Sequence, residues 1–437
     1  MQVTVESTEG LGRRMTIGLP ADAVENEVRK RLRSMAGKVR LDGFRPGKAP
    51  ISVIERRYGG QVRQEVLGDL MASSFSEAAA KESLRLASMP RFEPKSLDVN
   101  TGVEFIAHFE VYPDVVIGDV STYEIERPVA TITEQDIDNM LEKLRKQRRT
   151  WTETARPSQV EDRVVVDFAA TVGGETFPGS EGKEMPVILG SKQMLAPFES
   201  ELTGVTPGQV KEFDVVFPEN YQQPVLAGKT ARFVATVLRV EEPVLPELND
   251  EFLSLFGVES GGVAALRVEV TKNMQRELDR SLNSKTKNQV MERLLNAHEF
   301  PVPAAMVVGE AERLAEQMNE QLRAQGSVVP KGAAYQPGQF DASARKRVAL
   351  GLILAELIKQ NSLKPNREKV KEEIAKIASA YNDPNEVVDW YYQDKSRMSE
   401  VESMVLEDEV VKWVLARAKV TNAVTNFDAV MGSERAG

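Results

Sequence analysis

The spacing of apolar residues changes along this chain, and the change limits the folds that it can adopt. Residues 2–6, 12–19, 163–172 and 231–240 alternate between apolar and polar types, which is the pattern of β-strands. After about residue 250, apolar residues recur at every third or fourth position, which is the spacing of amphipathic helices. A chain of 437 residues is also longer than one ordinary hydrophobic core can serve. We therefore expect an α+β protein of several domains.

Residues 1–111 predict an α+β domain. Two strands precede a helix, and residues 103–111 return as a strand. Pro50 is suited to begin a further helix, because proline is tolerated in a first turn. A second helical segment is expected from about residue 61 to residue 80.

The middle of the chain predicts a linker and then a β domain. Residues 112–150 are expected to be extended at first and then helical, with Thr133 and Asp136 placed as a capping box. Residues 151–246 predict a compact, mostly antiparallel β domain with a short helix after Pro197.

Residues 247–437 are expected to be helical. Several of the helices are long and amphipathic, and the loops between them permit antiparallel pairs. Apolar residues at 266–282 mark one face of a long helix that FPVP at 300–303 ends, and those at 307–322 mark the next helix. Further helices are expected to run through 347–358 and 370–381, and a last one from about 396 to 418.

Composition excludes several kinds of chemistry. The chain has no cysteine, which excludes disulfides, thiolate nucleophiles and cysteine zinc sites. Its two histidines, His108 and His298, have no second histidine at metal-ligand spacing, so we expect no metal and no cofactor. No run approaches the roughly 18 apolar residues of a membrane helix, and the first residues lack the features of an export signal. We therefore expect a cytoplasmic protein that does not act at a membrane.

Charge is unevenly distributed. Between Arg29 and Arg57 there are ten basic residues and two acidic ones, a local charge of +8 in a chain whose net charge is −10. The remainder of the chain therefore carries −18. A basic patch on an acidic protein indicates one docking site for a polyanionic partner. The alternative is an ordinary solvated helix face.

Residues 43–50 lie within this basic stretch and have the sequence GFRPGKAP. They match the pattern G-F-R-x-G-x-x-P of the trigger factor family, which are bacterial ribosome-associated chaperones. The β domain resembles an FKBP-type peptidyl-prolyl isomerase, and a long helical region follows it. Because this order of domains is also that of the trigger factor family, the chain resembles the family over essentially its whole length.

The resemblance implies four segments with different roles. They are a ribosome-binding domain at 1–111, a linker and helix that join the helical body at 112–150, an FKBP-type isomerase domain at 151–246, and a helical domain that binds substrate polypeptides at 247–437. In this family the isomerase domain is an insertion into the helical body, which apolar spacing alone does not predict.

The resemblance also implies the partners. They are the large ribosomal subunit, with its protein and RNA at the polypeptide exit, and nascent and unfolded polypeptides. Further implied roles are protein export and cell division, and the resemblance allows a homodimer away from the ribosome. The implied ribosome-binding residues are Gly43, Phe44, Arg45, Pro46, Gly47, Lys48 and Pro50. Arginine and lysine would bind RNA phosphates without reading sequence, and Phe44 would add an apolar anchor.

The isomerase reaction suits a chain that is poor in acid–base groups. Rotation about an X–Pro bond has a barrier of about 18–20 kcal/mol, because the amide bond is partly double. A dry apolar pocket that fits the twisted form lowers this barrier without a base or a nucleophile. The resemblance places eight residues in such a pocket: Phe168, Phe177, Met185, Met194, Leu195, Phe198, Tyr221 and Phe233.

Three positions depart from the FKBP pattern. Pro178 stands where many FKBP domains have an acid, Met185 replaces an aromatic residue, and Phe198 replaces a tryptophan. The pocket remains apolar, but its isomerase activity and its substrate preference could differ from those of other FKBP domains. For each pocket residue taken singly, ordinary core packing is the alternative.

Two other functions remain open at this point. One is a free cytosolic prolyl isomerase without ribosome tethering, and the other is a nucleic-acid-binding protein with scaffolding domains. Methionine is adaptable and recurs at promiscuous surfaces. Most methionines of the helical region are expected to fill cores at helical spacing, and at most a third to face substrate polypeptides. Seven methionines follow residue 247, namely Met274, Met291, Met306, Met318, Met398, Met404 and Met431.

Overall fold

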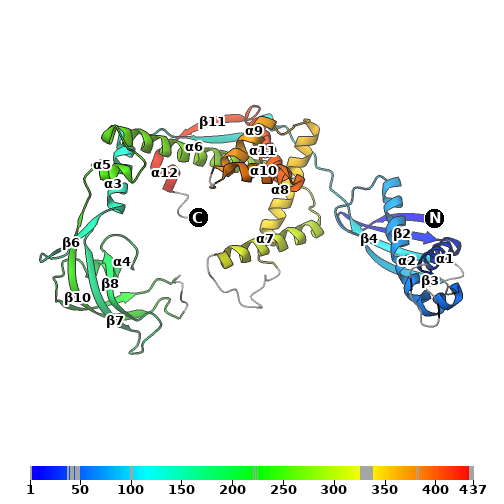
Figure 1. Ribbon diagram of the computed structural model, residues 1–437, viewed down its shortest axis with the longest axis horizontal. Helices are drawn as coiled ribbons and strands as arrows, with labels where there is room; N and C mark the ends of the chain where they lie inside the picture. Colours follow the sequence, from blue (N-terminus) through cyan, green and yellow to red (C-terminus); the bar gives the residue numbers. More distant parts are fainter. Residues whose placement is uncertain are drawn as a thin grey trace. The chain divides into compact units, whose positions relative to one another are not determined.

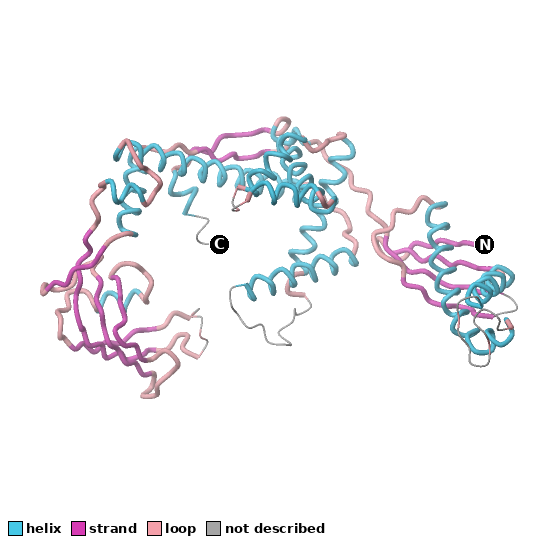
Figure 2. The backbone as a smooth tube through the Cα atoms, in the orientation of Figure 1, coloured by secondary structure: helices cyan, strands magenta, loops and turns pink. Residues whose placement is uncertain are grey.

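The computed structural model describes residues 2–36, 39, 44, 50–98, 102–219, 221, 223, 225–324, 338–379, 381 and 383–432. Figure 1 labels its helices and strands in sequence order. Its contacts divide the chain into two units. The first unit consists of Met1–Pro128 and Asn283–Ala423, and the second consists of Val129–Leu282 and Val424–Gly437. Helices and antiparallel sheets occur in separate parts of the chain, which confirms the expected α+β multidomain class (Figure 2).

The first unit begins with an antiparallel sheet whose strand order is β1-β2-β4-β3. Its strands are β1 (Gln2–Ser7), β2 (Gly12–Leu19), β3 (Arg91–Asp98) and β4 (Gly102–Glu110). The sequence predicts all of them except β3, in which Pro94 and charged neighbours interrupt the apolar alternation. Because β3 lies at the sheet edge, proline is tolerated there, and the register shifts between Pro94 and Ser96.

Two helices pack on one face of this sheet, namely α1 (Ala21–Ala36) and α2 (Ile51–Lys81). The expectation of two separate helical segments after Pro50 is wrong, because α2 continues through Gly59 and Gly60. Each glycine costs a helix about 1 kcal/mol relative to alanine. One apolar face of α2 is buried on both sides of the glycine pair, from Ile54 to Phe75, and this burial offsets the cost.

A second sheet lies in the second unit and is antiparallel, as expected. Its strands are β6 (Thr150–Thr154), β7 (Arg163–Thr171), β8 (Glu181–Ile188), β9 (Val210–Val216) and β10 (Thr230–Val244). The strand order is β6-β10-β7-β8, and β9 also pairs with β10. The short helix α4 (Ala196–Glu201) includes Pro197, as predicted.

A buried ion pair stabilises this β domain. Glu241 on β10 is 6% exposed and accepts hydrogen bonds from Arg163 and Arg239. Burial would raise the pKa of Glu241, but the two guanidinium groups hold it below its usual value. A carboxylate with a lowered pKa in the folded state stabilises the fold above its unfolded pKa. This contribution is lost as the pH falls through the folded-state pKa.

One helical core of the second unit combines segments from both sides of the β domain. Its helices are α3 (Glu134–Gln147), α5 (Asp250–Ser254), the first part of α6 (Gly262–Asn296) and α12 (Phe427–Gly432). The predicted capping box at the start of α3 is confirmed, because Thr133 and Asp136 each bond the other's backbone N–H.

The first unit contains the remaining helices. They are α7 (Ala304–Ala324), α8 (Asp341–Gln360), α9 (Arg367–Ala378), α10 (Pro384–Tyr392) and α11 (Lys395–Leu415), together with the turn η1 (Val120–Thr122). The sequence predicts all of these helices except α10. Its aromatic end, WYY, lacks a helical apolar spacing, and α10 buries no residue fully.

The final part of this region also differs from expectation. The last helix was expected to reach Ala418, but α11 ends at Leu415. Residues Lys419–Val424 form the strand β11, which pairs with β5 (Glu124–Val129). The pairing joins segments almost three hundred residues apart, and Arg127 binds the Asn422 side chain across it at 3.0 Å.

We predict that Leu278→Ala destabilises the helical core of the second unit. Leu278 on α6 is 0% exposed, so truncation leaves a cavity. The free energy of unfolding should fall by about 2–5 kcal/mol. Urea unfolding followed by circular dichroism should show a lower midpoint for the helical transition. Arg280→Ala, at an exposed position two residues away on the same helix, is the control and should leave the midpoint nearly unchanged. Equal midpoints for the two variants would contradict the prediction.

Candidate functional site

Three phenylalanines form the centre of the β domain. They are Phe168 on β7, Phe198 on α4 and Phe233 on β10. The ring of Phe198 lies 5.8 Å from that of Phe168 and 5.2 Å from that of Phe233, in edge-on arrangements. Such geometry is favourable for aromatic pairs. Phe198 is 1% exposed and therefore forms the floor of the group.

The other five predicted pocket residues pack against the same apolar cluster. Each of them is partly buried, so the cluster has an accessible side. They are Phe177, Met185, Met194, Leu195 and Tyr221. All eight residues that the sequence singled out therefore lie together, although they come from three strands, one helix and the connecting loops.

Two further aromatic residues of the cluster were missed by the sequence analysis. Phe213 on β9 lies opposite Phe233 in the strand register and stacks on it, with ring centroids 5.9 Å apart. Phe217 lies 6.1 Å from Phe177 and 4.7 Å from Tyr221. The signal was present in the sequence, because residues 213, 215 and 217 are alternate apolar positions of one strand and its end.

A glycine makes room for one of the rings. Gly182 on β8 pairs with Phe168 in the register. A side-chain Cβ at position 182 would lie 2.5 Å from Cε1 of Phe168, which is closer than real Cβ atoms approach. The position of the Phe168 ring therefore depends on the absence of a side chain at residue 182.

A buried carboxylate holds one loop of the cluster. Glu199 follows Phe198 on α4 and is 6% exposed. It accepts the backbone N–H groups of Gly190 at 2.9 Å, Met194 at 3.1 Å and Lys192 at 3.3 Å. The helix that carries the floor residue thereby also fixes the loop that carries Met194 and Leu195.

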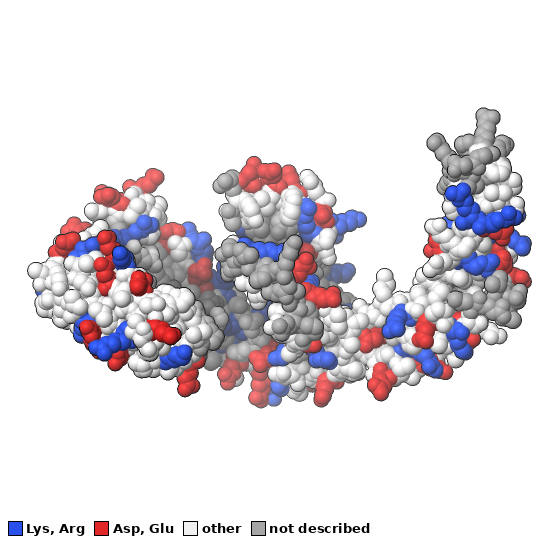
Figure 3. Space-filling model, turned by 90° about the horizontal axis from the view of Figure 1, so that it is seen from below, with Lys and Arg blue, Asp and Glu red and all other residues white. Residues whose placement is uncertain are grey.

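The basic surface of the N-terminal part is smaller than the sequence count suggests. Arg31 on α1 binds Glu65 at 2.6 Å and Asp69 at 2.9 Å, both on α2, and Lys30 binds Glu27 at 3.2 Å. The acids Glu65 and Asp69 lie outside the window in which the sequence count was made. Figure 3 shows basic and acidic side chains side by side on this part of the molecule.

Within residues 29–57, four described arginines are exposed and have no ion pair to any described residue. They are Arg29 and Arg33 on α1, and Arg56 and Arg57 on α2. These helices flank residues 43–50 in the sequence. Within that segment Phe44 is 41% exposed and Pro50 is the residue before α2. The predicted residues Gly43, Arg45, Pro46, Gly47 and Lys48 lie outside the described residues.

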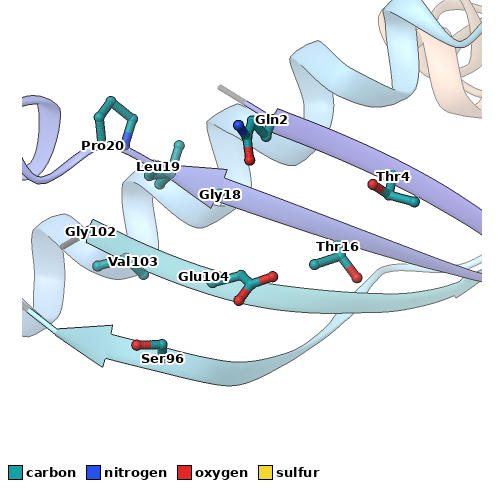
Figure 4. Close-up of a pocket in the computed structure, with 10 residues that line it drawn as sticks. All are labelled: Gln2, Thr4, Thr16, Gly18, Leu19, Pro20, Ser96, Gly102, Val103 and Glu104. Carbon is teal, nitrogen blue, oxygen red and sulfur yellow. The ribbon is translucent and has the colours of Figure 1, made fainter.

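The open face of the N-terminal sheet contains a hollow of about 570 Å³. Thr4, Thr16 and Glu104 line it, and Gly18 and Gly102 leave space between them (Figure 4). The Glu104 carboxylate is paired with Lys95 at 2.9 Å. None of the predicted site residues lies in this hollow.

The two histidines have structural contacts. His108 lies 3.1 Å from the Glu93 carboxylate, and His298 accepts the Gly118 N–H at 3.1 Å. Among the described residues there is no group of three or more metal-ligating side chains. In the same part of the chain, no helix is both long enough and apolar enough to cross a membrane.

The β domain and its aromatic cluster define an FKBP-type peptidyl-prolyl isomerase domain. A family model described as FKBP-type peptidyl-prolyl cis-trans isomerase matches residues 154–238. Models described as bacterial trigger factor protein and its C-terminus match residues 1–144 and 262–416. The chain belongs to the trigger factor family.

Relatives of known identity agree with the family models. The trigger factor of Thioalkalivibrio sulfidiphilus (strain HL-EbGR7) is 43% identical over 100% of this chain and 99% of the relative. That of Ectopseudomonas mendocina (strain ymp) is 45% identical over 99% of each. The chain is therefore a ribosome-associated chaperone that binds nascent polypeptides and catalyses isomerisation of X–Pro bonds.

Among solved structures, one is described as "Promiscuous Substrate Recognition in Folding and Assembly Activities of the Trigger Factor Chaperone". It is 19% identical, with a TM-score of 0.48, and the match covers 95% of this chain and 99% of that chain.

We predict that Glu199→Gln impairs the isomerase by releasing the loop. An amide has one acceptor oxygen, and its NH₂ group would face backbone donors that now meet a carboxylate. Losing one or two such bonds should lower kcat/KM for a proline peptide about ten-fold. The matched control is Glu212→Gln on β9, whose carboxylate is exposed and bound to Arg232 at 2.6 Å. Equal kcat/KM values for the two variants would contradict the prediction.

Proposed function

We propose that residues 43–50 and the arginines beside them bind RNA and protein of the large ribosomal subunit at the polypeptide exit. The supporting observation is that Arg29, Arg33, Arg56 and Arg57 are exposed, with no ion pair to any described residue, on the helices that flank this segment. Phosphate contacts of this kind supply affinity that weakens as salt rises. Phe44 supplies an apolar group for the ribosomal protein.

We predict that Phe44→Ala combined with Arg45→Ala abolishes binding to ribosomes. The double variant removes the apolar anchor and a guanidinium group suited to phosphate. Co-sedimentation with translating ribosomes at graded salt measures the effect. Lys95→Ala, which removes a charge already paired with Glu104 in the same domain, should sediment like the unchanged chain. If the double variant still sediments with ribosomes like the unchanged chain, residues 43–50 are not the docking site. The alternative, a prolyl isomerase that is not tethered to the ribosome through this segment, would then be favoured.

The eight-residue cluster is proposed as the prolyl pocket. Phe168, Phe198 and Phe233 offer an apolar surface for the prolyl ring while the amide bond before it twists, and burial excludes water from this surface. The twisted amide has lost much of its charge separation, so an apolar surface binds it better than it binds the planar amide. Tyr221 lies at the partly exposed side and is proposed to donate its hydroxyl to a substrate carbonyl. No step requires a proton acceptor.

We predict that Phe198→Leu lowers isomerase activity and leaves ribosome binding intact. The substitution keeps an apolar floor but removes ring contacts with Phe168 and Phe233. A loss of about 1–3 kcal/mol of transition-state binding corresponds to roughly a 5- to 160-fold decrease in kcat/KM. A proline-peptide assay and co-sedimentation should be run on the same preparation. Parallel loss of both activities would contradict separate sites, and unchanged kcat/KM would exclude Phe198 from the pocket.

The domain assignment follows from these sites. Residues 1–111 are proposed as the ribosome-binding domain, 151–246 as the isomerase, and 112–150 with 247–437 as the substrate-binding body. We place the protein in the cytoplasm, where translating ribosomes are found. A homodimer away from the ribosome is also proposed, and sedimentation velocity over a range of concentrations would test it.

A further inference from the structure

The pairing of β7 with β8 contains an irregularity next to the aromatic cluster. Val166 on β7 pairs with Met185 on β8, and Phe168 pairs with Gly182. One residue of β7 separates the first two positions, whereas two residues of β8 separate their partners. This is a β-bulge, in which one strand carries an extra residue and the local pairing is interrupted.

The single residue of β7 within the bulge, Asp167, binds the backbone of the opposite strand. Its Oδ1 atom accepts the N–H of Glu184 at 2.7 Å. Glu184 has a φ of +48°, which lies in the left-handed region that a residue with a side chain rarely adopts. The hydrogen bond from Glu184 to the Asp167 carboxylate therefore stabilises a backbone conformation that glutamate by itself disfavours.

The bulge decides which residue of β8 lies opposite Phe168. Residues directly opposite each other in an antiparallel pair share one face of the sheet, and Phe168 belongs to the apolar cluster on that face. A regular ladder continued from the pair at 166 and 185 would place Lys183 opposite Phe168. The bulge places Gly182 there instead, and the Phe168 ring occupies the space that a side chain at 182 would take. The bulge thus keeps a charged side chain away from the cluster.

We propose that Asp167 is a positioning residue of the isomerase, because it holds the bulge that keeps Gly182 opposite Phe168. Asp167 itself points to the other face of the sheet, since neighbours on a strand alternate, and it has no contact with substrate in this role. The inference rests on the prolyl pocket proposed above and adds a residue outside its lining. Without the hydrogen bond from Glu184, the strand returns to the regular ladder and brings Lys183 beside the Phe168 ring.

Alanine and asparagine at position 167 test the hydrogen bond in the full chain. Asp167→Ala removes the acceptor, and kcat/KM for a leucyl-proline peptide should fall about three- to ten-fold, the size of one partly exposed hydrogen bond. Asp167→Asn keeps an acceptor oxygen for the same N–H and should be more active than Asp167→Ala. The matched control is Asp214→Ala, which removes an exposed carboxylate on β9 and should leave kcat/KM unchanged.

The choice of substrate separates positioning from a general loss of stability. A lysine ammonium beside the Phe168 ring repels a peptide with arginine before the proline and attracts one with glutamate there. Asp167→Ala should therefore lower kcat/KM more for the arginyl-proline peptide than for the glutamyl-proline peptide. The ratio of the two values should change about two- to five-fold, the size of one exposed charge pair. A loss of fold stability alone would lower both values equally.

A second substitution tests the bulge itself. Glycine adopts a positive φ without steric strain, so Glu184→Gly holds the bulge without help from the carboxylate. Added to Asp167→Ala, it should restore most of the lost kcat/KM. The control is Glu181→Gly, at an exposed position of β8 outside the bulge, which should restore none of it.

Three outcomes would overturn the proposal, and the third also reaches the pocket. If Asp167→Ala is as active as Asp214→Ala while Phe198→Leu is impaired, the prolyl pocket stands and the bulge does not position it. If both charged peptides lose activity equally, or Glu184→Gly restores no more than Glu181→Gly, Asp167 does not act through the bulge. If Asp167→Ala and Phe198→Leu are both fully active, the proposed pocket itself is wrong.

Discussion

The helical cores depend on segments that lie on either side of the β domain in the sequence. Helix α3 precedes that domain, and it shares a core with α5, α6 and α12, which follow it. In the first unit, Val120, Tyr123 and Ile125 similarly pack against residues of α6, α8 and α11. Neither core is complete until the chain has returned from the β domain. The β domain is therefore inserted in the sequence between the segments that form the helical core of the second unit.

This arrangement explains which parts of the fold the sequence could predict. Long helices such as α6 and α11 follow from local apolar spacing, and the capping box of α3 follows from two residues. The insertion and the pairing of β5 with β11 depend on contacts between distant segments, which local spacing does not contain. The sequence missed the edge strand β3 because its pairing with β4 is a contact between segments that tolerates Pro94 at a sheet edge. It missed the continuity of α2 because burial of one helix face outweighs the local preference of the Gly59-Gly60 pair.

The residues of the candidate sites also fall into those that the sequence could predict and those that it could not. The resemblance to FKBP domains brought eight residues together, and Phe213 and Phe217 were recoverable from strand alternation. The role of Glu199 was not recoverable, because its partners are backbone N–H groups of a loop whose path the sequence does not give. The pairing of Arg31 with Glu65 and Asp69 was likewise hidden until the two helices were seen to pack.

The Glu199 carboxylate fixes the 190–194 loop mainly by binding backbone N–H groups of the loop. This mode of binding has an evolutionary consequence. Main-chain N–H groups are present whatever side chains the loop carries, proline excepted. Gly190 has a φ of +83° and no room for a Cβ beside Val160, so it is constrained. The other residues of this stretch can vary among descendants of the gene while the loop keeps its path. At the proposed prolyl pocket, substrate preference could then change by point mutation in this loop, without a compensating change in α4.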